Sequence, residues 1–237
     1  KILIQNTVFK IYDGQTQIIL TAIVNGLILL PFVLLFTPAG YLSDRHPKPR
    51  VMQVSAAVAV GLTLLITLAY YQGWFRFAFA MTFLLAVQSA FYSPAKYGYI
   101  KELTGKERLT TANAIVQAVT IVAILLGIFI FSVFFEQALT GVSYDSPAQL
   151  LQAIAPVGWI LVACAGLGFL STLRLPATGT GAADLSFDWT RYGKGRYLRD
   201  NLHTILGNRS IWLSIVGLSA FWGISQVVLA AFPAFAK

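Results

Sequence analysis

Two rows of polar side chains interrupt the long apolar blocks of this sequence. The members of the first row are four residues apart: Gln88, Tyr92 and Lys96. The second row follows in the next apolar block: Asn113, Gln117 and Thr120. Residues three and four apart lie on one face of a helix, so each row forms a stripe if its segment is helical. An ammonium group, amides and hydroxyls in such stripes could line a path for a polar or charged group through an apolar environment.

Each row also has a simpler interpretation. A lysine close to a bilayer is costly unless it reaches the interface, is paired or serves a site. Lys96 could meet this condition simply by lying at the interface, as an ordinary positive residue on the cytoplasmic side. Asn113 and Gln117 could hydrogen-bond to neighbouring helices of one bundle. The setting of Lys96, two residues after Pro94 and beside tyrosines, favours a functional role for it.

The segment around Pro94 is expected to disturb its helix. A proline has no backbone N–H, leaves a carbonyl of the preceding turn unpaired, and kinks or ends a helix. Ser93 and Pro94, followed by Gly98, therefore form a predicted helix-breaking motif at the start of a basic loop at 96–108.

The apolar blocks themselves are typical of bilayer spans. Hydrophobic residues make up 57% of the 237 residues and charged residues 11%, and the mean hydropathy is +0.72. Soluble domains average roughly 45–50% apolar and about 25% charged residues, which excludes an ordinary soluble protein. Apolar blocks of roughly 18 or more residues indicate transmembrane helices. We expect an all-α polytopic membrane protein with spans at 18–38, 51–71, 77–92, 111–135, 150–173 and from 211 onward.

The basic residues predict the orientation. The formal net charge is +8, but 13 of the 17 lysines and arginines lie in three segments that share one side of the membrane if every block spans once: 40–50, 96–108 and 174–209. Such segregation places these segments in the cytoplasm and argues against nucleic-acid binding. The connections on the opposite side hold Lys10, Asp13, Arg76, Glu136 and Asp145.

The segment between the first two full spans carries a motif, Gly40-Tyr-Leu-Ser-Asp44-Arg45-His-Pro-Lys-Pro-Arg50. Gly40 would permit close helix approach, and Asp44 could pair with Arg45 or Arg50 or lie at a helix N-terminus. Contacts of this kind can hold one state of an alternating-access cycle and break in the other, whereas the simpler interpretation is that the charges only mark the cytoplasmic side. The segment resembles the G-x-L-x-D-R-x-x-x-R loop between helices 2 and 3 of major facilitator transporters.

That resemblance implies a twelve-helix fold of two halves, of which this sequence would be a fragment. Residues 1–12 would be the end of helix 1, residues 17–173 helices 2 to 6, residues 174–210 the central cytoplasmic loop and residues 211–237 helix 7. Each half of this fold contains inverted three-helix repeats, and substrate binds near the midplane between the halves.

A second resemblance narrows the family to the bacterial lysophospholipid transporters. It covers the region of helices 4 and 5 and rests on four stretches: Ser93–Gly98, Glu102-Leu103, Ala112–Ala114 and Thr120–Gly127. Members of that family move lysophospholipids, mainly lysophosphatidylethanolamine, from the outer to the inner leaflet of the bacterial cytoplasmic membrane for re-acylation. The resemblance implies that a lysophospholipid headgroup follows the two polar rows. It also implies that Lys96 pairs with a helix 1 aspartate, which would precede Lys1.

Some members of that family are fused to acyltransferase and acyl-carrier-protein ligase domains. An acyltransferase, fused or separate, is therefore an expected partner, in addition to membrane lipid. One alternative function is the membrane and substrate-delivery domain of such a fused enzyme. Another is a drug or metabolite exporter, but a proton-coupled exporter would favour buried acids, and no Asp or Glu lies within the predicted spans.

The long polar segment 174–210 is predicted to have two parts. Residues 177–183, composed of Ala, Thr and Gly, form a flexible linker. After Trp189 the apolar residues recur at helical spacing opposite charged ones: Tyr197, Leu198, Leu202, Ile205 and Leu206. This pattern predicts an amphipathic helix at the cytoplasmic surface, and the alternative is a linker helix that docks on protein without lipid specificity.

No catalytic constellation is visible in the sequence. Cys164 has no second cysteine for a disulfide, and His46 and His203 lie in predicted cytoplasmic loops. No Gly-rich phosphate loop or metal-ligand cluster appears. We therefore expect no cofactor, no metal and no enzyme activity for this chain.

Overall fold

The computed structural model describes residues 1–12, 14–179, 181–182 and 184–235, with side chains up to Ser225. Asp13 of the charges predicted on the opposite side and two positions of the predicted linker lie outside this part. The regular structure of the described residues is entirely α-helical. The helices are α1 (Ile2–Ile11), α2 (Gly14–Leu34), α3 (Phe36–Arg45), α4 (Lys48–Tyr71), α5 (Phe75–Leu139), α6 (Pro147–Leu173), α7 (Trp189–Gly193), α8 (Arg196–Gly207) and α9 (Arg209–Phe235). They form two compact units, 1–185 and 186–237.

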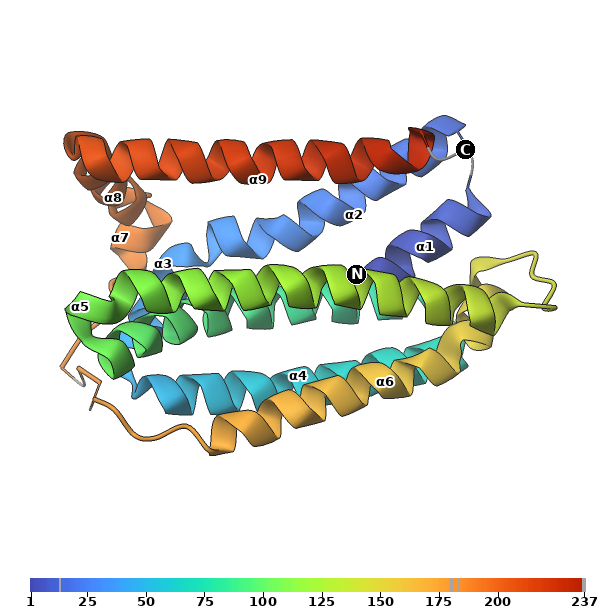
Figure 1. The fold of residues 1–237 in the computed structure, drawn as a ribbon, viewed down its shortest axis with the longest axis horizontal. Coiled ribbons are helices and arrows are strands. Elements are labelled where there is room, and N and C mark those ends of the chain that lie inside the picture. Colours follow the sequence, from blue (N-terminus) through green and yellow to red (C-terminus); the bar gives the residue numbers. More distant parts are fainter. Residues whose placement is uncertain (13, 180, 183, 236–237) are drawn as a thin grey trace. The chain divides into compact units, whose positions relative to one another are not determined.

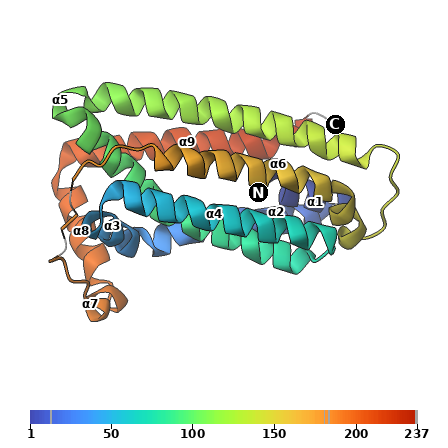
Figure 2. The same cartoon turned by 90° about the horizontal axis from the view of Figure 1, so that it is seen from below.

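Four helices of the first unit are long and apolar enough to cross a membrane: α2, α4, α5 and α6. Helix α5 has 65 residues, about 98 Å at 1.5 Å per residue, which is far more than a bilayer of about 30 Å. At Gly105 the backbone takes φ 68° and ψ 179°, a conformation that glycine adopts without steric cost. Gly105 thus divides α5 into two arms that run in opposite directions (Figures 1 and 2).

The predicted helix breaks are therefore in part wrong. Helix α5 continues through Pro94 and ends its first arm only at Gly105, so Ser93, Pro94 and Gly98 do not end the helix. The predicted loop 96–108 is helical apart from that one turn. A proline is tolerated in transmembrane helices because neighbouring groups can satisfy the freed carbonyl.

The predicted span 18–38 is also divided. Helix α2 ends at Leu34, and α3 starts at Phe36 and continues to Arg45. Pro38 has no N–H for the i→i−4 ladder, and the helix is interrupted one turn earlier, at Leu35. The motif segment is consequently helical up to Arg45, with only His46 and Pro47 between α3 and α4.

Helix α4 packs along both α6 and α5, as the two orthogonal views show (Figures 1 and 2). Small residues allow the close contact with α6: a Cβ at Gly158 would lie 2.7 Å from Oγ1 of Thr67. Where lipid surrounds a bundle, close backbone approach at small residues is a main source of helix association.

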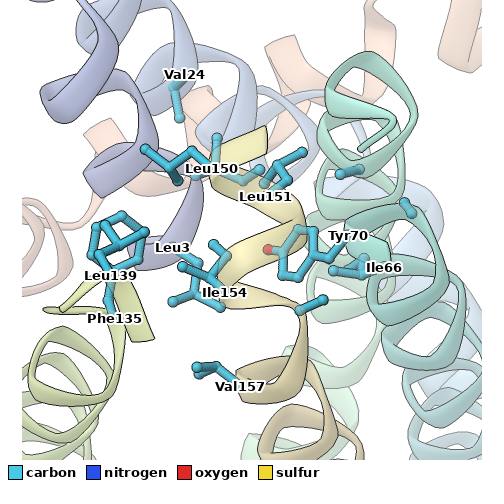
Figure 3. Close-up of a cluster of buried hydrophobic side chains, with 14 residues drawn as sticks. Leu3, Val24, Ile66, Tyr70, Phe135, Leu139, Leu150, Leu151, Ile154 and Val157 are labelled. Carbon is cyan, nitrogen blue, oxygen red and sulfur yellow. The ribbon is translucent and has the colours of Figure 1, made fainter. Parts of the chain in front are cut away.

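The largest core cluster lies at the end of the unit where α4 ends and α6 begins. Tyr70, Phe135 and Ile154 are almost fully buried there (Figure 3). Leu3 of α1 joins the same cluster. This end is therefore packed through contacts from α1, α4, α5 and α6.

Ion pairs lie at both ends of the unit. Lys10 Nζ is 2.9 Å from Glu136 Oε2, and Lys48 pairs with Glu102. The sequence predicts Lys10 and Glu136 on one side of the membrane and Lys48 and Glu102 on the other, and these pairs agree with that prediction.

Candidate functional site

The first polar row lies on one continuous helix. Gln88, Tyr92 and Lys96 are all half-buried in the first arm of α5, so the condition for a shared face is met. Tyr92 packs against the small cluster around Val51 and Met52 of α4. Lys96 forms no ion pair with any described residue, and its Nζ lies 4.8 Å from the centre of the Tyr97 ring, within the range of a cation–π interaction.

The second polar row lies in the other arm of α5, and its three members differ. Thr120 donates its hydroxyl to the carbonyl of Val116 at 2.6 Å, within its own helix. Gln117 accepts a hydrogen bond of 3.5 Å from the Tyr97 hydroxyl. Asn113 Oδ1 is buried and has no hydrogen-bond partner among the described residues. A buried acceptor without a partner is rare in folded proteins and requires an explanation.

Tyr97 joins the two rows. Its ring faces the Lys96 ammonium, and its hydroxyl reaches Gln117 on the other arm. Tyr97 is not among the site residues predicted from the sequence, although its position directly after Lys96 was the available signal. The structure thus brings Lys96 and Gln117 to the same tyrosine.

A second polar network lies at the Gly105 end of α5. Glu102 accepts hydrogen bonds from Lys48 at 2.5 Å and from Thr178 at 2.7 Å, one on each carboxylate oxygen. The side chains of Lys48 and Glu102 are only 14% and 28% exposed, so this pair is better shielded from solvent than a surface ion pair. It connects the start of α4 to the first arm of α5.

The predicted switch residues lie close to this network but outside it. Asp44, Arg45 and Arg50 are exposed, and Asp44 has no ion pair with a described residue, so its predicted pairing with Arg45 or Arg50 is not seen in this conformation. Arg45 instead donates to the Tyr41 hydroxyl. A Cβ at Gly40 would meet nothing within 4 Å, so Gly40 mediates no close approach here.

The described residues from Pro176 to Leu185, which follow α6, are bonded to two helices, α3 and α5. The Tyr99 hydroxyl donates to the carbonyl of Pro176 at 3.2 Å, and the Ala182 N–H donates to the carbonyl of Asp44 at 3.0 Å. The Tyr41 hydroxyl donates to the carbonyl of Leu185 at 3.0 Å. With the bond from Thr178 to Glu102, these contacts form a strap. The described residues of the predicted flexible linker are therefore held in place.

A profile of the Major Facilitator Superfamily matches residues 4–237, nearly the whole chain. The chain belongs to the major facilitator superfamily. The superfamily assignment confirms the predicted fold class of a multi-pass α-helical membrane protein. It also agrees with the resemblance of the Gly40–Arg50 segment to the loop between helices 2 and 3.

Curated relatives of this superfamily member include lysophospholipid transporters. The chain is 29% identical over 216 residues to "Lysophospholipid transporter LplT" of Serratia proteamaculans, covering 90% of this chain and 47% of the relative. It is 30% identical over 222 residues to the protein of that name from Yersinia pestis (strain Pestoides F), covering 90% and 46%. The Photorhabdus laumondii protein is 39% identical over 99 residues, 42% of this chain and 23% of the relative.

The chain thus spans about half the length of the curated relatives that it matches over most of its own length. No solved structure matches the chain at a significant level. The family resemblance predicted from the stretches around Ser93–Gly98 is confirmed by these relatives.

Two of the residues in the polar networks were missed by sequence reasoning. Lys48 and Glu102 are 54 positions apart; Lys48 was counted only as a loop charge, and Glu102 only as a loop charge and as part of a stretch that carries the family resemblance. Among the described residues, no group of three or more His, Cys, Asp and Glu side chains could hold a metal ion.

Proposed function

We propose that this chain is part of a lysophospholipid transporter of the major facilitator superfamily, with lysophosphatidylethanolamine as the favoured substrate. The transporter moves the lipid from the outer to the inner leaflet of the bacterial cytoplasmic membrane, where an acyltransferase, fused or separate, re-acylates it. The substrate class is supported by the relatives that match 90% of this chain, which are lysophospholipid transporters by name.

The observation that carries the proposal is the pair of polar rows joined by Tyr97. Lys96 has no anionic partner among the described residues, so its ammonium group can bind the phosphate of a lysophospholipid by charge-assisted hydrogen bonds. Asn113 Oδ1 has no donor and can accept a hydrogen bond from the ethanolamine ammonium or the free glycerol hydroxyl. Together they supply complementary groups for a zwitterionic headgroup with a free hydroxyl.

The apolar surroundings suit the other end of the same substrate. Val119, Val122 and Phe129 of the second arm of α5 are more than half exposed, as expected for a surface in contact with acyl chains. An amphiphile can therefore keep its tail in or near lipid while its headgroup follows the polar rows. A substrate that is polar throughout would have no use for this arrangement.

The network at Lys48, Glu102 and the strap is proposed to stabilise one state of the alternating-access cycle. The two inverted repeats of a half must change their contacts when the site opens to the other side. The pair connects α4 to α5, and the strap adds bonds to α3 and α5. Opening at this end would therefore break bonds that are formed here, and Asp44 would take a partner in another state.

The test compares two substrates in cells. Spheroplasts of a strain without its own lysophospholipid transporter receive the full-length protein, and the uptake of labelled lysophosphatidylethanolamine is measured beside the extrusion of a panel of drugs. The proposal expects lipid uptake above the empty-vector level and no drug extrusion. Drug extrusion without lipid uptake would identify an exporter and overturn the proposal.

A further inference from the structure

Helix α8 presents an apolar row beside a basic row, with no residue of the helix buried. Leu198, Leu202 and Leu206 are four residues apart and 59%, 46% and 60% exposed. Arg199 lies in the neighbouring row, and Arg196 lies one turn before it. Three exposed leucines in one row would be unfavourable in water, so this face is built to be covered.

The acidic residue on α8 is already neutralised within the second unit. Asp200 Oδ2 accepts a bond of 2.7 Å from Arg191 of α7, and the Arg191 guanidinium lies 4.9 Å from the centre of the Tyr197 ring. The hydrogen bond from Arg191 holds the pKa of Asp200 below its usual value, so the pair persists at neutral pH. Arg199 Nε also lies 3.8 Å from Asp200 Oδ1, with 78% of its side chain exposed. Lys194 and Arg196 form no ion pair with a described residue, so positive charge remains in excess for an anionic partner.

Helix α8 is connected directly to a long apolar helix. It ends at Gly207, and α9 begins at Arg209. The Asn208 side chain accepts bonds from the N–H groups of Ser210 and Ile211 at 3.1 and 3.3 Å and so caps the start of α9. Helix α9 has 27 residues and no charged residue after Arg209, which is long enough to cross a bilayer. The end of α8 must therefore lie at the boundary where α9 enters the membrane.

We propose that α8 binds the anionic phospholipid surface of the cytoplasmic leaflet, with Leu198, Leu202 and Leu206 among the acyl chains and Arg196 and Arg199 on lipid phosphates. The inference goes beyond lysophospholipid transport and does not depend on it. Charge complementarity selects lipid as the partner, because the excess charge on and beside the helix is positive and the cytoplasmic leaflet is rich in anionic lipid. An amphipathic helix with arginines beside its apolar face lies in the plane of such an interface.

The test uses the full-length protein in nanodiscs. A nitroxide label is attached at Leu202→Cys on the apolar row or at Thr204→Cys, an exposed residue on the opposite face, each in a background in which Cys164 and every other native cysteine are replaced by Ser. Collision with oxygen, which dissolves in lipid, is compared with collision with a water-soluble nickel chelate. Each label is measured in pure phosphatidylcholine and in a mixture with phosphatidylglycerol.

The proposal expects the label at 202 to shift toward oxygen and away from nickel in the anionic nanodiscs, while the label at 204 stays accessible to nickel. The R196Q/R199Q variant should lose most of that shift. The matched variant K101Q/K106Q, which removes two charges from the same predicted side of the membrane, should keep it. A label at 202 that is accessible to nickel in both lipids would overturn the proposal. A label that is protected equally in both lipids and in R196Q/R199Q would do so too, since it would indicate docking on protein.

Discussion

The side chain of Lys48 lies across the backbone of Gly98. A Cβ at position 98 would lie 2.5 Å from Cε and 2.9 Å from Cδ of Lys48, closer than side chains approach each other. One turn further along α5, the same lysine reaches Glu102. The absence of a side chain at Gly98 therefore allows the ion pair between α4 and α5 to form.

The first prediction is an energetic coupling between Gly98 and Lys48. In the native background, Lys48→Gln should lower the free energy of unfolding by about 1 kcal/mol, the upper range for a partly exposed ion pair. In a Gly98→Ala background the same change should cost almost nothing, because the added methyl group has already displaced the lysine. Thermal unfolding of the four proteins in detergent measures this non-additivity.

A matched control for that cycle is Gly127→Ala, where an added Cβ meets nothing within 4 Å. Lys48→Gln should keep its full cost in the Gly127→Ala background. An equal cost of Lys48→Gln in all three backgrounds would contradict the role assigned to Gly98.

The second prediction separates transport from stability at Asn113. Asn113→Leu removes a buried acceptor that has no partner, so the stability of the protein should not fall. Lysophospholipid uptake should fall about tenfold, the effect of losing one hydrogen bond to a charged group. Thr82→Val is the control, because the Thr82 hydroxyl is bonded to Ala78 within its own helix and lies outside both polar rows, and its uptake should remain close to the native level. Equal uptake by both variants would remove Asn113 from the substrate path.

The third prediction concerns Asp44, which is exposed and has no ion pair with a described residue in this conformation. Asp44→Lys should change the free energy of unfolding by less than about 0.5 kcal/mol, as is usual for surface positions. It should nevertheless shift the populations trapped by crosslinks between the two halves of the transporter. Glu107→Lys, an equal change at another exposed acid near the Gly105 turn, should not. If neither variant moves the populations, Asp44 only marks the cytoplasmic side.

The fourth prediction tests the packing of α4 on α6. Gly158→Ala would place a Cβ 2.7 Å from Thr67 Oγ1 and 2.8 Å from its Cγ2, and such overpacking costs about 1–3 kcal/mol. Thermal unfolding should show this loss, and Thr67→Ala should restore most of it by making room. Gly166→Ala, in the same helix but with open space around it, should be neutral. A loss at Gly166 as large as at Gly158 would mean that glycine flexibility, and not close packing, is required.

The arrangement of the helices was largely predictable because apolar length and the distribution of basic residues are local properties of the sequence. The positions at which the helices are interrupted were not predictable. Pro94 predicts an interruption but lies within a continuous helix, whereas Gly105 divides α5. The difference is physical: a proline costs one hydrogen bond that neighbouring groups can replace, but a positive φ at glycine redirects the whole chain.

The two polar rows of the site were predictable from the sequence, but the contacts that join them were not. The i+4 spacing identified Lys96 and Asn113, but the link through Tyr97 depends on how the two arms of α5 meet. The pairing of Lys48 with Glu102 depends on the register between α4 and α5, about which neither segment carries local information. The contacts of Thr178 with Glu102 likewise arise only after the strap has folded back over these helices.

The central claim is that Lys96 binds the headgroup of a lysophospholipid during its movement between leaflets. Its most direct test is a flip assay with purified full-length protein in liposomes, in which fluorescent lysophosphatidylethanolamine is added outside and the fraction protected from an external quencher is followed over time. The native protein and Lys101→Ala, an exposed lysine on the same arm of α5, should transfer the lipid at similar rates. Lys96→Ala should be correctly inserted and reduced to the rate of protein-free liposomes. Transfer by Lys96→Ala at the native rate would contradict the account.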